Sequence, residues 1–155
     1  MNAKARIESV RTKLLEQSPD DELVPDSKRL EVVGVMAASL ARARAGCAAV
    51  EDWRVLADLV QHIRTMEQAG NLQRAETDEH MTRAFRCLAL ASESCRTGGG
   101  LTFDSCGLEA LEDLLAVYDQ SLAFLSQREA LEIGFATAAR VARESASLDD
   151  TSSAL

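Results

Sequence analysis

Reactive side chains are few in this chain, which has four cysteines and two histidines among 155 residues. Cys95 and Cys106 flank the glycines at residues 98–100, and a turn there would bring them close together. Cys106 falls in the first turn of an expected helix, where the helix dipole lowers the pKa of a thiol. A cysteine nucleophile also needs a nearby base, and neither His62 nor His80 is close in the sequence. We therefore predict a reactive thiol at Cys106 without assigning it a catalytic role.

The spacing of histidines and acids does not fit a metal site. Glu76 lies four residues before His80, and Glu67 lies five residues after His62. A di-iron carboxylate bundle needs the pattern Glu-x-x-His on two helices, with further glutamates projecting inward. Neither histidine has that spacing, so the sequence predicts neither a metal nor a cofactor. The glycines at residues 98–100 lack the following lysine of a phosphate-binding loop, and we expect a simple turn there.

The clearest charge pattern lies on the helix expected after residue 104. Its acids share one side of that helix, opposite a row formed by Leu108, Leu111, Leu115 and Tyr118. An acidic side is typical of a helix that faces solvent, but it would also suit docking onto a protein partner with a basic surface. We call four of these acids the acidic strip: Glu109, Glu112, Asp113 and Asp119.

Residues 1–17 are predicted to form an amphipathic helical arm. Ile7, Val10 and Leu14 recur at alternating three- and four-residue spacing, which gives one apolar row along a helix. Residues 18–27 contain both prolines of the chain and form a connector that interrupts the helix. A short helix is marginal in water without a surface to pack on. We therefore predict that the apolar row mediates self-association, for example in a homodimer.

Strong helix formers dominate the rest of the chain, and no segment shows the alternation of a β-strand. Asp104 is a suitable N-cap for one helix, and Ser126 with Glu129 has the spacing of a capping box for the next. We therefore predict an all-α fold with a single helical bundle of five main helices at residues 28–145, and a disordered tail at residues 146–155. The inward residues expected before the glycine turn include Leu30, Val33, Ala37 and Leu40 on the first main helix and Phe85, Cys87 and Cys95 on the third.

Composition excludes several classes of partner. The formal net charge is −8 at pH 7, which disfavours nucleic acid because phosphate contacts need concentrated Lys and Arg. No run approaches the ~20 apolar residues of a membrane span, and no apolar segment near the N-terminus suggests a signal peptide. The four cysteines form no CxxC pair, which is typical of reduced thiols in a cytosol. We expect a cytoplasmic protein that binds neither membranes nor nucleic acid directly.

The segment from Trp53 to Val141 carries a pattern shared with a group of small proteins. Trp53-x-x-Leu56-Ala57-Asp58 opens a helix that ends in Gly70, and Gly107-Leu108-x-Ala110-Leu111 leads to Tyr118-Asp119 and then Leu125-Ser126-Gln127-Arg128. This pattern resembles small helical proteins of phages, prophages and plasmids in Gram-negative bacteria. The resemblance implies an accessory protein of a mobile element, a class whose small acidic members often bind and block host machinery. It implies no catalytic residues.

Together these patterns indicate binding rather than catalysis. We predict a non-catalytic protein–protein interaction module that binds and modulates or inhibits a host factor, with inhibition of a host defence as the sharpest version. The alternative is a helical enzyme or small-ligand-binding bundle whose site is assembled from distant residues. Scarce histidine and the lack of a recurring acid–base set on an inward face favour the first interpretation.

Overall fold

The computed structural model describes the backbone of residues 3–153 and the side chains of residues 4–145. Within that range the chain contains helices and no strand, which confirms the predicted all-α class. The arm predicted for residues 1–17 is a helix of 15 residues, comparable in length to the others. The helices are α1 (Ala3–Gln17), α2 (Asp26–Arg44), α3 (Val50–Gln68), α4 (Arg74–Arg96), α5 (Ser105–Leu122) and α6 (Gln127–Ser153).

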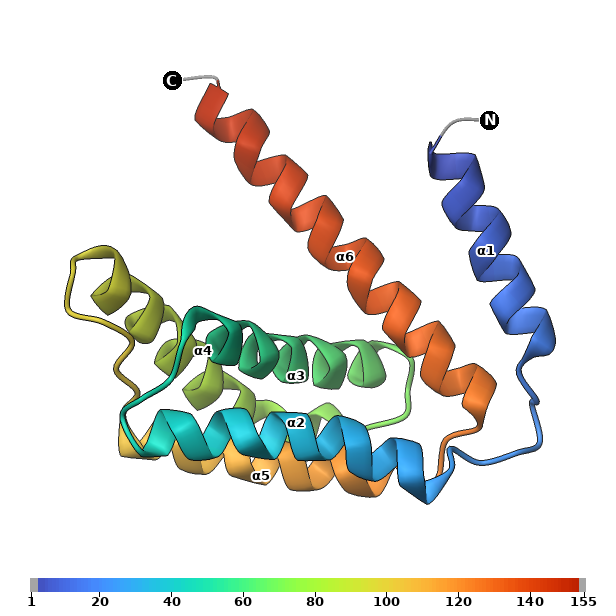
Figure 1. Cartoon of the computed structure of the whole chain (residues 1–155), viewed down its shortest axis with the longest axis horizontal. Coiled ribbons are helices and arrows are strands. Elements are labelled where there is room, and N and C mark those ends of the chain that lie inside the picture. The colour runs from blue at the N-terminus through green and yellow to red at the C-terminus, as the bar shows by residue number, and fades with distance from the viewer. Residues whose placement is uncertain (1–2, 154–155) are drawn as a thin grey trace. The chain divides into compact units, whose positions relative to one another are not determined.

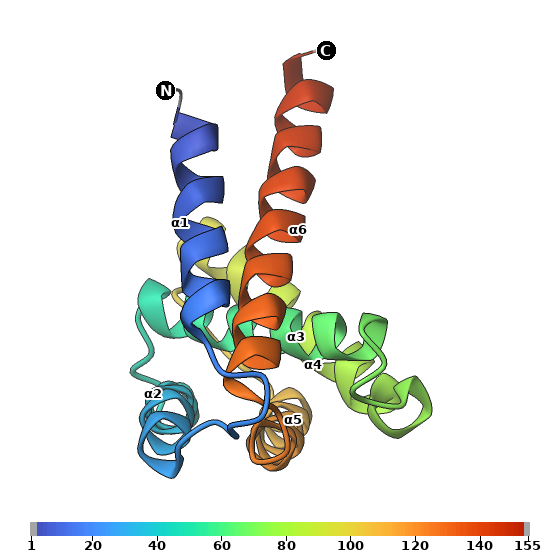
Figure 2. The same cartoon turned by 90° about the vertical axis from the view of Figure 1, so that its right-hand side faces the viewer.

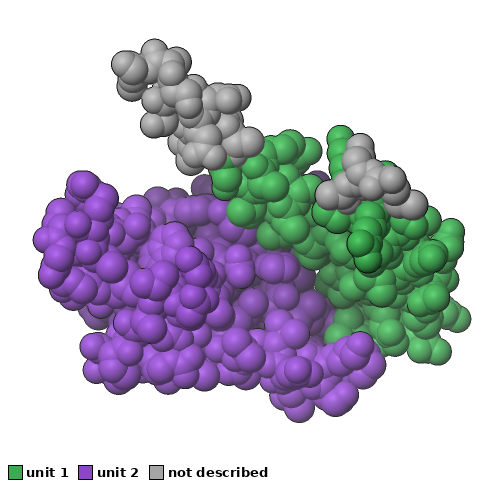
Figure 3. All heavy atoms as spheres, turned by 45° about the horizontal axis from the view of Figure 1, so that its top comes forward, with its two compact units in different colours: residues 1–24, 124–155 green, residues 25–123 purple. Residues whose placement is uncertain are grey.

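The chain divides into two compact units, which Figure 3 shows in different colours. Residues 25–123 form the central unit, and residues 1–24 together with 124–155 form the terminal unit. This division differs from the single bundle predicted for residues 28–145, because α6 groups with α1 and not with α2 to α5.

The central unit is an up-and-down bundle of α2 to α5. In Figure 1 each of these helices runs opposite to the one before it, and Figure 2 shows α2 and α5 nearly end-on and side by side. α2 packs on α3 and α5, and α4 packs on the same two helices, so the four helices close a ring. The least exposed large side chains lie inside this ring, on α3 and α5. They include Leu56, Leu59, Val60, Ile63, Met66, Leu111 and Leu114.

Local sequence signals set the ends of these helices. Asp104 accepts a hydrogen bond from the Gly107 amide at 2.7 Å, which confirms it as the N-cap of α5. α2 and α3 are followed by Gly46 and Gly70, whose φ angles of 74° and 81° lie in the left-handed region that favours glycine. The next amide then reaches back to a helical carbonyl in each case, from Cys47 to Arg42 at 3.0 Å and from Asn71 to Met66 at 2.9 Å.

α2 buries a different face from the predicted one. Leu40 is buried as expected, together with Met36, Ser39 and Ala43, but Leu30 is 62% exposed and Ala37 also faces solvent. The prediction for Leu30 and Ala37 is therefore wrong. α2 carries apolar residues on nearly all sides, so its sequence period does not specify which side meets the core.

α4 follows its predicted pattern only in part. Cys87 is buried as predicted, whereas Cys95 is exposed and Phe85 is 38% exposed. The buried row of α4 ends at Ala91, so the last turn of the helix extends beyond the core and carries Cys95 with it.

A short backbone connection organises the terminal unit. The segment before α2 pairs with the turn before α6 through an antiparallel bridge between Leu23 and Ser126. Two backbone hydrogen bonds flank the bridge, from the Val24 amide to Leu125 at 3.0 Å and from the Gln127 amide to Glu22 at 2.9 Å. The chain runs toward this connection along α1 and away from it along α6, and Figure 1 shows the two helices diverging on the same side of it.

The start of α6 confirms the predicted capping box. The Ser126 amide donates to Glu129 Oε2 at 2.8 Å, and the Glu129 amide donates to Ser126 Oγ at 3.1 Å. No glycine or proline follows Gly134, and α6 continues to Ser153. The backbone of residues 146–153 is therefore helical where a disordered tail was expected, and residues 154–155 lie outside the described range.

Candidate functional site

Most of the acidic strip is paired with basic residues of the central unit. Glu112 Oε2 lies 2.6 Å from Arg44 Nη2, and Asp113 Oδ2 lies 3.3 Å from His80 Nδ1. These contacts tie α5 to α2 and α4, but all four side chains remain at the surface, where such pairs contribute little to stability. Glu109 is exposed, and the described residues supply no ion pair for it.

The fourth acid of the strip, Asp119, is the most enclosed of the set. Its Oδ1 lies 2.7 Å from Nη1 of Arg29, whose side chain is only 21% exposed. Hydrogen bonds from Arg29 to Asp26 and to Asp119 raise the pKa of the guanidinium. A basic partner would have to compete with Arg29 for Asp119 and with Arg44 for Glu112. The part of the strip in partner binding stays a prediction.

A buried carboxylate joins α2 to α3. Asp52 is 4% exposed and accepts hydrogen bonds from Ser39 Oγ at 2.9 Å and from Arg42 Nη2 at 2.6 Å. Its second oxygen accepts the Ala49 amide at 2.8 Å, at the start of α3. The Arg42 hydrogen bond, followed by that of Ala49, holds the pKa of Asp52 well below its usual range. All its oxygens are used within the protein, so Asp52 fixes the α2–α3 pair and is not free to act on a ligand.

Beyond this clamp, α2 and α3 form a shallow groove. The hollow has a volume of about 280 Å³ and is lined by Val32, Val35 and Met36 of α2 together with Val55 of α3. Val32 and Val35 are 42% and 53% exposed, so the groove presents apolar surface to water. Two acids also line it, Glu31 on α2 and Asp58 on α3, together with His62 of α3. We call this feature the α2–α3 groove.

The imidazole of His62, which lines the groove, is held in place by two contacts. Its Nδ1 lies 2.7 Å from the Asp58 carbonyl oxygen, which can only accept, so Nδ1 carries a hydrogen. The imidazole also packs edge-on against Tyr118, with ring centroids 5.8 Å apart. Burial raises the pKa of Tyr118 to about 12, so this phenol stays neutral at physiological pH.

The predicted apolar row of α1 is exposed along its whole length. Ile7 is 66%, Val10 52% and Leu14 42% exposed. The side of α1 that faces α6 is a neighbouring one, because the guanidinium of Arg11 lies 5.4 Å from the centroid of the Phe135 ring. The row is thus available for contact with another surface.

The cysteines are free thiols in different settings. Cys106 is exposed, as its predicted reactivity requires, and so are Cys47 and Cys95. Burial, followed by the nearby Asp104, raises the pKa of Cys87 to about 12. Among the residues whose side chains are described, neither histidine contacts Cys106, and no nucleophile is paired with a base.

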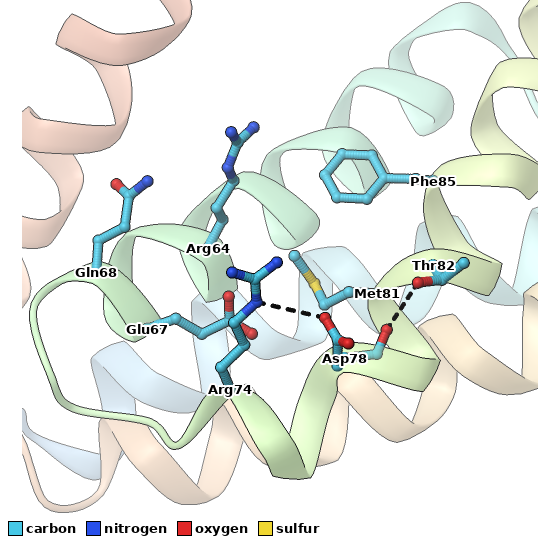
Figure 4. Close-up of a pocket in the computed structure, with 8 residues that line it drawn as sticks. All are labelled: Arg64, Glu67, Gln68, Arg74, Asp78, Met81, Thr82 and Phe85. Carbon is cyan, nitrogen blue, oxygen red and sulfur yellow. Dashed lines mark hydrogen bonds and ion pairs between the residues drawn. The ribbon is translucent and has the colours of Figure 1, made fainter.

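A larger hollow lies between the end of α3 and the start of α4, and Figure 4 shows it. It has a volume of about 580 Å³, within the range of small-molecule sites. The side chains of Arg64 and Arg74 extend in the same general direction, and the Phe85 ring lies across from them. Arg74 Nε lies 3.4 Å from Asp78 Oδ1, and Glu67 accepts a hydrogen bond from Thr77. The hollow thus contains as many acids as arginines, and both acids already contact neighbouring side chains.

Sequence reasoning missed the α2–α3 groove. The notable signal was an excess of apolar residues on α2, more than one buried face can use, but Val55 and Asp58 join them only when α3 packs alongside. The hollow of Figure 4 was missed for the same reason.

Comparisons with known proteins add no relative. No family model, curated protein or solved structure matches the chain, so the resemblance to phage and plasmid proteins gains no support from them. Over the described part of the chain, no helix is long and apolar enough to cross a membrane. The same part holds no group of three or more His, Cys, Asp or Glu residues placed to bind a metal ion.

Proposed function

We propose that the protein is a non-catalytic protein–protein interaction module whose α2–α3 groove binds a basic amphipathic helix. The observation that carries the proposal is the exposed apolar lining at Val32 and Val35, in a groove that also contains an acid on each helix. A helix that docks in a groove inserts apolar residues spaced three and four positions apart. Exposed apolar surface bordered by charge is typical of such sites.

The charges of the groove define its partner. Glu31 on α2 and Asp58 on α3 are exposed, and the described ion pairs include neither of them. They are therefore better placed than the acidic strip to meet Lys or Arg of a partner, because Glu112 and Asp119 already have basic partners. Rim charges of this kind act mainly on association rate and specificity. A host factor of the kind implied by the resemblance to mobile-element proteins would bind here through such a helix, in competition with any other helix that fits the groove.

The ligand-binding alternative rests on the hollow of Figure 4. Its size suits a small molecule, but Arg74 and Asp78 pair with each other, and Glu67 bonds to Thr77. It offers no acid–base pair directed at one point, so we rank it below the groove.

A designed peptide tests the groove directly. The probe is a lysine-rich helical peptide with one row of leucines, and its matched control has glutamates in place of the lysines. Fluorescence anisotropy should show that the lysine peptide binds at least about tenfold more tightly than the glutamate peptide, and that added salt weakens it. Equal affinity for the two peptides would contradict the role assigned to the acids of the groove.

Two variants locate the binding. Val35→Asp places a charge in the groove and should weaken peptide binding by at least about tenfold, since burying an unpaired charge is costly. Leu90→Asp makes a comparable change at a 52% exposed residue of α4 that does not line the groove, and it should have no effect. Equal binding by Val35→Asp and the wild type would place the site elsewhere.

A further inference from the structure

We infer that the helix bound by the α2–α3 groove is α1 of a second copy of this chain. The inference rests on the proposed function, because it names the partner of the same groove. Two copies would then associate by exchanging their α1 helices, each one docking in the groove of the other. The self-association predicted from the sequence would then use two surfaces, the apolar row of α1 and the α2–α3 groove.

Both surfaces expose apolar side chains to water. Ile7, Val10 and Leu14 form an apolar row on α1 that is 42–66% exposed. Val32 and Val35 expose comparable apolar surface in the groove. The row has the three- and four-residue spacing with which helices fill a groove. α1 is about 22 Å long at 1.5 Å per residue, enough for the row to make several contacts in succession.

The charged residues beside the two apolar surfaces are also opposite in sign. Successive residues turn by about 100° around a helix, which places Arg6 and Lys13 on one side of the apolar row and Lys4 and Arg11 on the other. Lys4, Arg6 and Lys13 are exposed on these flanks, whereas Arg11 lies against the Phe135 ring of α6 and 4.0 Å from Glu8. The groove is lined by Glu31 on α2, by valines of both helices and by Asp58 on α3, so each of the two helices that form it carries an acid. Opposite charges on both flanks favour this docking over most others.

The same charges disfavour direct pairing of two α1 helices. In the antiparallel register that matches the apolar rows, Ile7 faces Val10 of the other copy. Lys4 then lies on the same flank as Arg11 of the other copy, and Arg6 on the same flank as Lys13. A parallel pair would place the flank of Lys4 and Arg11 beside the flank of Arg6 and Lys13. Like charges along both flanks oppose either arrangement, whereas the groove offers acids at the same places.

Analytical ultracentrifugation of the full chain tests the exchange. The wild type should form a concentration-dependent dimer. Val10→Asp on α1 and Val35→Asp in the groove should each raise the dissociation constant at least about tenfold. Leu90→Asp should leave it unchanged. All three residues are exposed, and circular dichroism would verify that each variant retains its helix content.

Mixing variants distinguishes exchange from other modes of dimerisation. A chain with Val10→Asp keeps an intact groove, and a chain with Val35→Asp keeps an intact α1, so an equimolar mixture should regain one docking contact and form mixed dimers. The charge order gives a second test. Lys4→Glu with Lys13→Glu should dissociate the dimer, as should Glu31→Lys with Asp58→Lys, and mixing these two double variants should restore association in part.

A wild type that stays monomeric at all concentrations would overturn the exchange of α1 helices. A dimer that is sensitive to Val10→Asp but not to Val35→Asp would overturn it too. A mixture of variants that stays monomeric overturns it as well. The lysine peptide separates this failure from failure of the proposed function. If the peptide binds the groove of a monomeric chain, the groove is a docking site for another protein. If the lysine peptide does not bind, both the proposed function of the groove and the exchange of α1 helices are contradicted.

Discussion

At the scale of single residues, Asp52 shows how one buried acid can hold two helices together. Its carboxylate receives hydrogen bonds from Ser39 and Arg42 of α2 and from the Ala49 amide ahead of α3. These bonds stabilise the charged form and so depress its pKa relative to that of the unfolded chain. The folded state consequently binds fewer protons than the unfolded state over the pH range between the two pKa values.

Asp52 should therefore make stability depend on acid pH. Its contribution is fully present above the ordinary aspartate pKa near 3.8, and it is lost as the pH falls through the folded pKa. Urea unfolding between pH 7 and pH 3 should show that Asp52→Asn is less stable than the wild type at neutral pH. The difference between the two should shrink at the acid end. Asp58→Asn, at an exposed acid of the same helix, is the control and should unfold like the wild type. A difference that is constant with pH would contradict this account.

Gly107 makes a second residue-scale prediction, because α4 and α5 approach each other closely there. A Cβ at this position would collide with Cys87 of α4 and with the Asp104 carboxylate that caps α5. Gly107→Ala should reduce the free energy of unfolding by about 1–3 kcal/mol through overpacking. Gly34→Ala, where nothing lies within 4 Å of the added atom, should instead stabilise the chain by ~0.5–1 kcal/mol. Chemical denaturation of the two variants should give opposite signs, and a loss in both would refute the packing argument.

At the scale of elements, signals local to the chain predicted the helices well. Asp104 and the pair Ser126 and Glu129 cap helices with bonds to residues only three positions away, so the sequence contains the whole interaction. The face that each helix buries was less predictable. α2 is apolar on nearly all sides, and only packing against α3 and α5 decides that Met36 is buried and Leu30 exposed.

Candidate sites depend on helix pairing even more than buried faces do. The groove needs Val35 of α2 beside Val55 of α3, and the pairs of the acidic strip need Arg29 and Arg44 of α2 beside α5. No spacing within one helix encodes these neighbours. The sequence could therefore place Glu112 and Asp119 on one helix side without indicating that both have basic partners.

At the scale of the whole molecule, Leu131, Phe135, Ala138 and Val141 have the three- and four-residue spacing of a core helix, and α6 therefore falls inside the bundle predicted for residues 28–145. In the structure Leu131, Phe135 and Val141 are only half-buried, and Ala138 is exposed. The terminal unit is joined by backbone hydrogen bonds of Val24 and Gln127 and by side-chain contacts such as that of Arg128 with Asp20, all between residues far apart in the sequence. Local pattern could not have indicated that the two ends of the chain form one unit and the middle another.

The central unit should fold without the rest of the chain. The ring of α2 to α5, the Asp52 clamp and the hydrogen bond from Trp53 Nε1 to the Leu88 carbonyl at 2.9 Å all lie within residues 25–123. A fragment with these bounds should be helical by circular dichroism and unfold cooperatively on heating, as compact single domains of this size do.

The same fragment separates the two surfaces of the proposed dimer. It keeps the α2–α3 groove and lacks α1, so it should bind the lysine peptide as tightly as the full chain does, or more tightly where α1 of another copy competes for the groove. It should also remain monomeric at concentrations at which the full chain dimerises. Val35→Asp within the fragment is the control for specific binding. A folded fragment that still dimerises would show that α1 is not the exchanged element, whereas a fragment without a cooperative transition would show that the central bundle depends on the terminal unit.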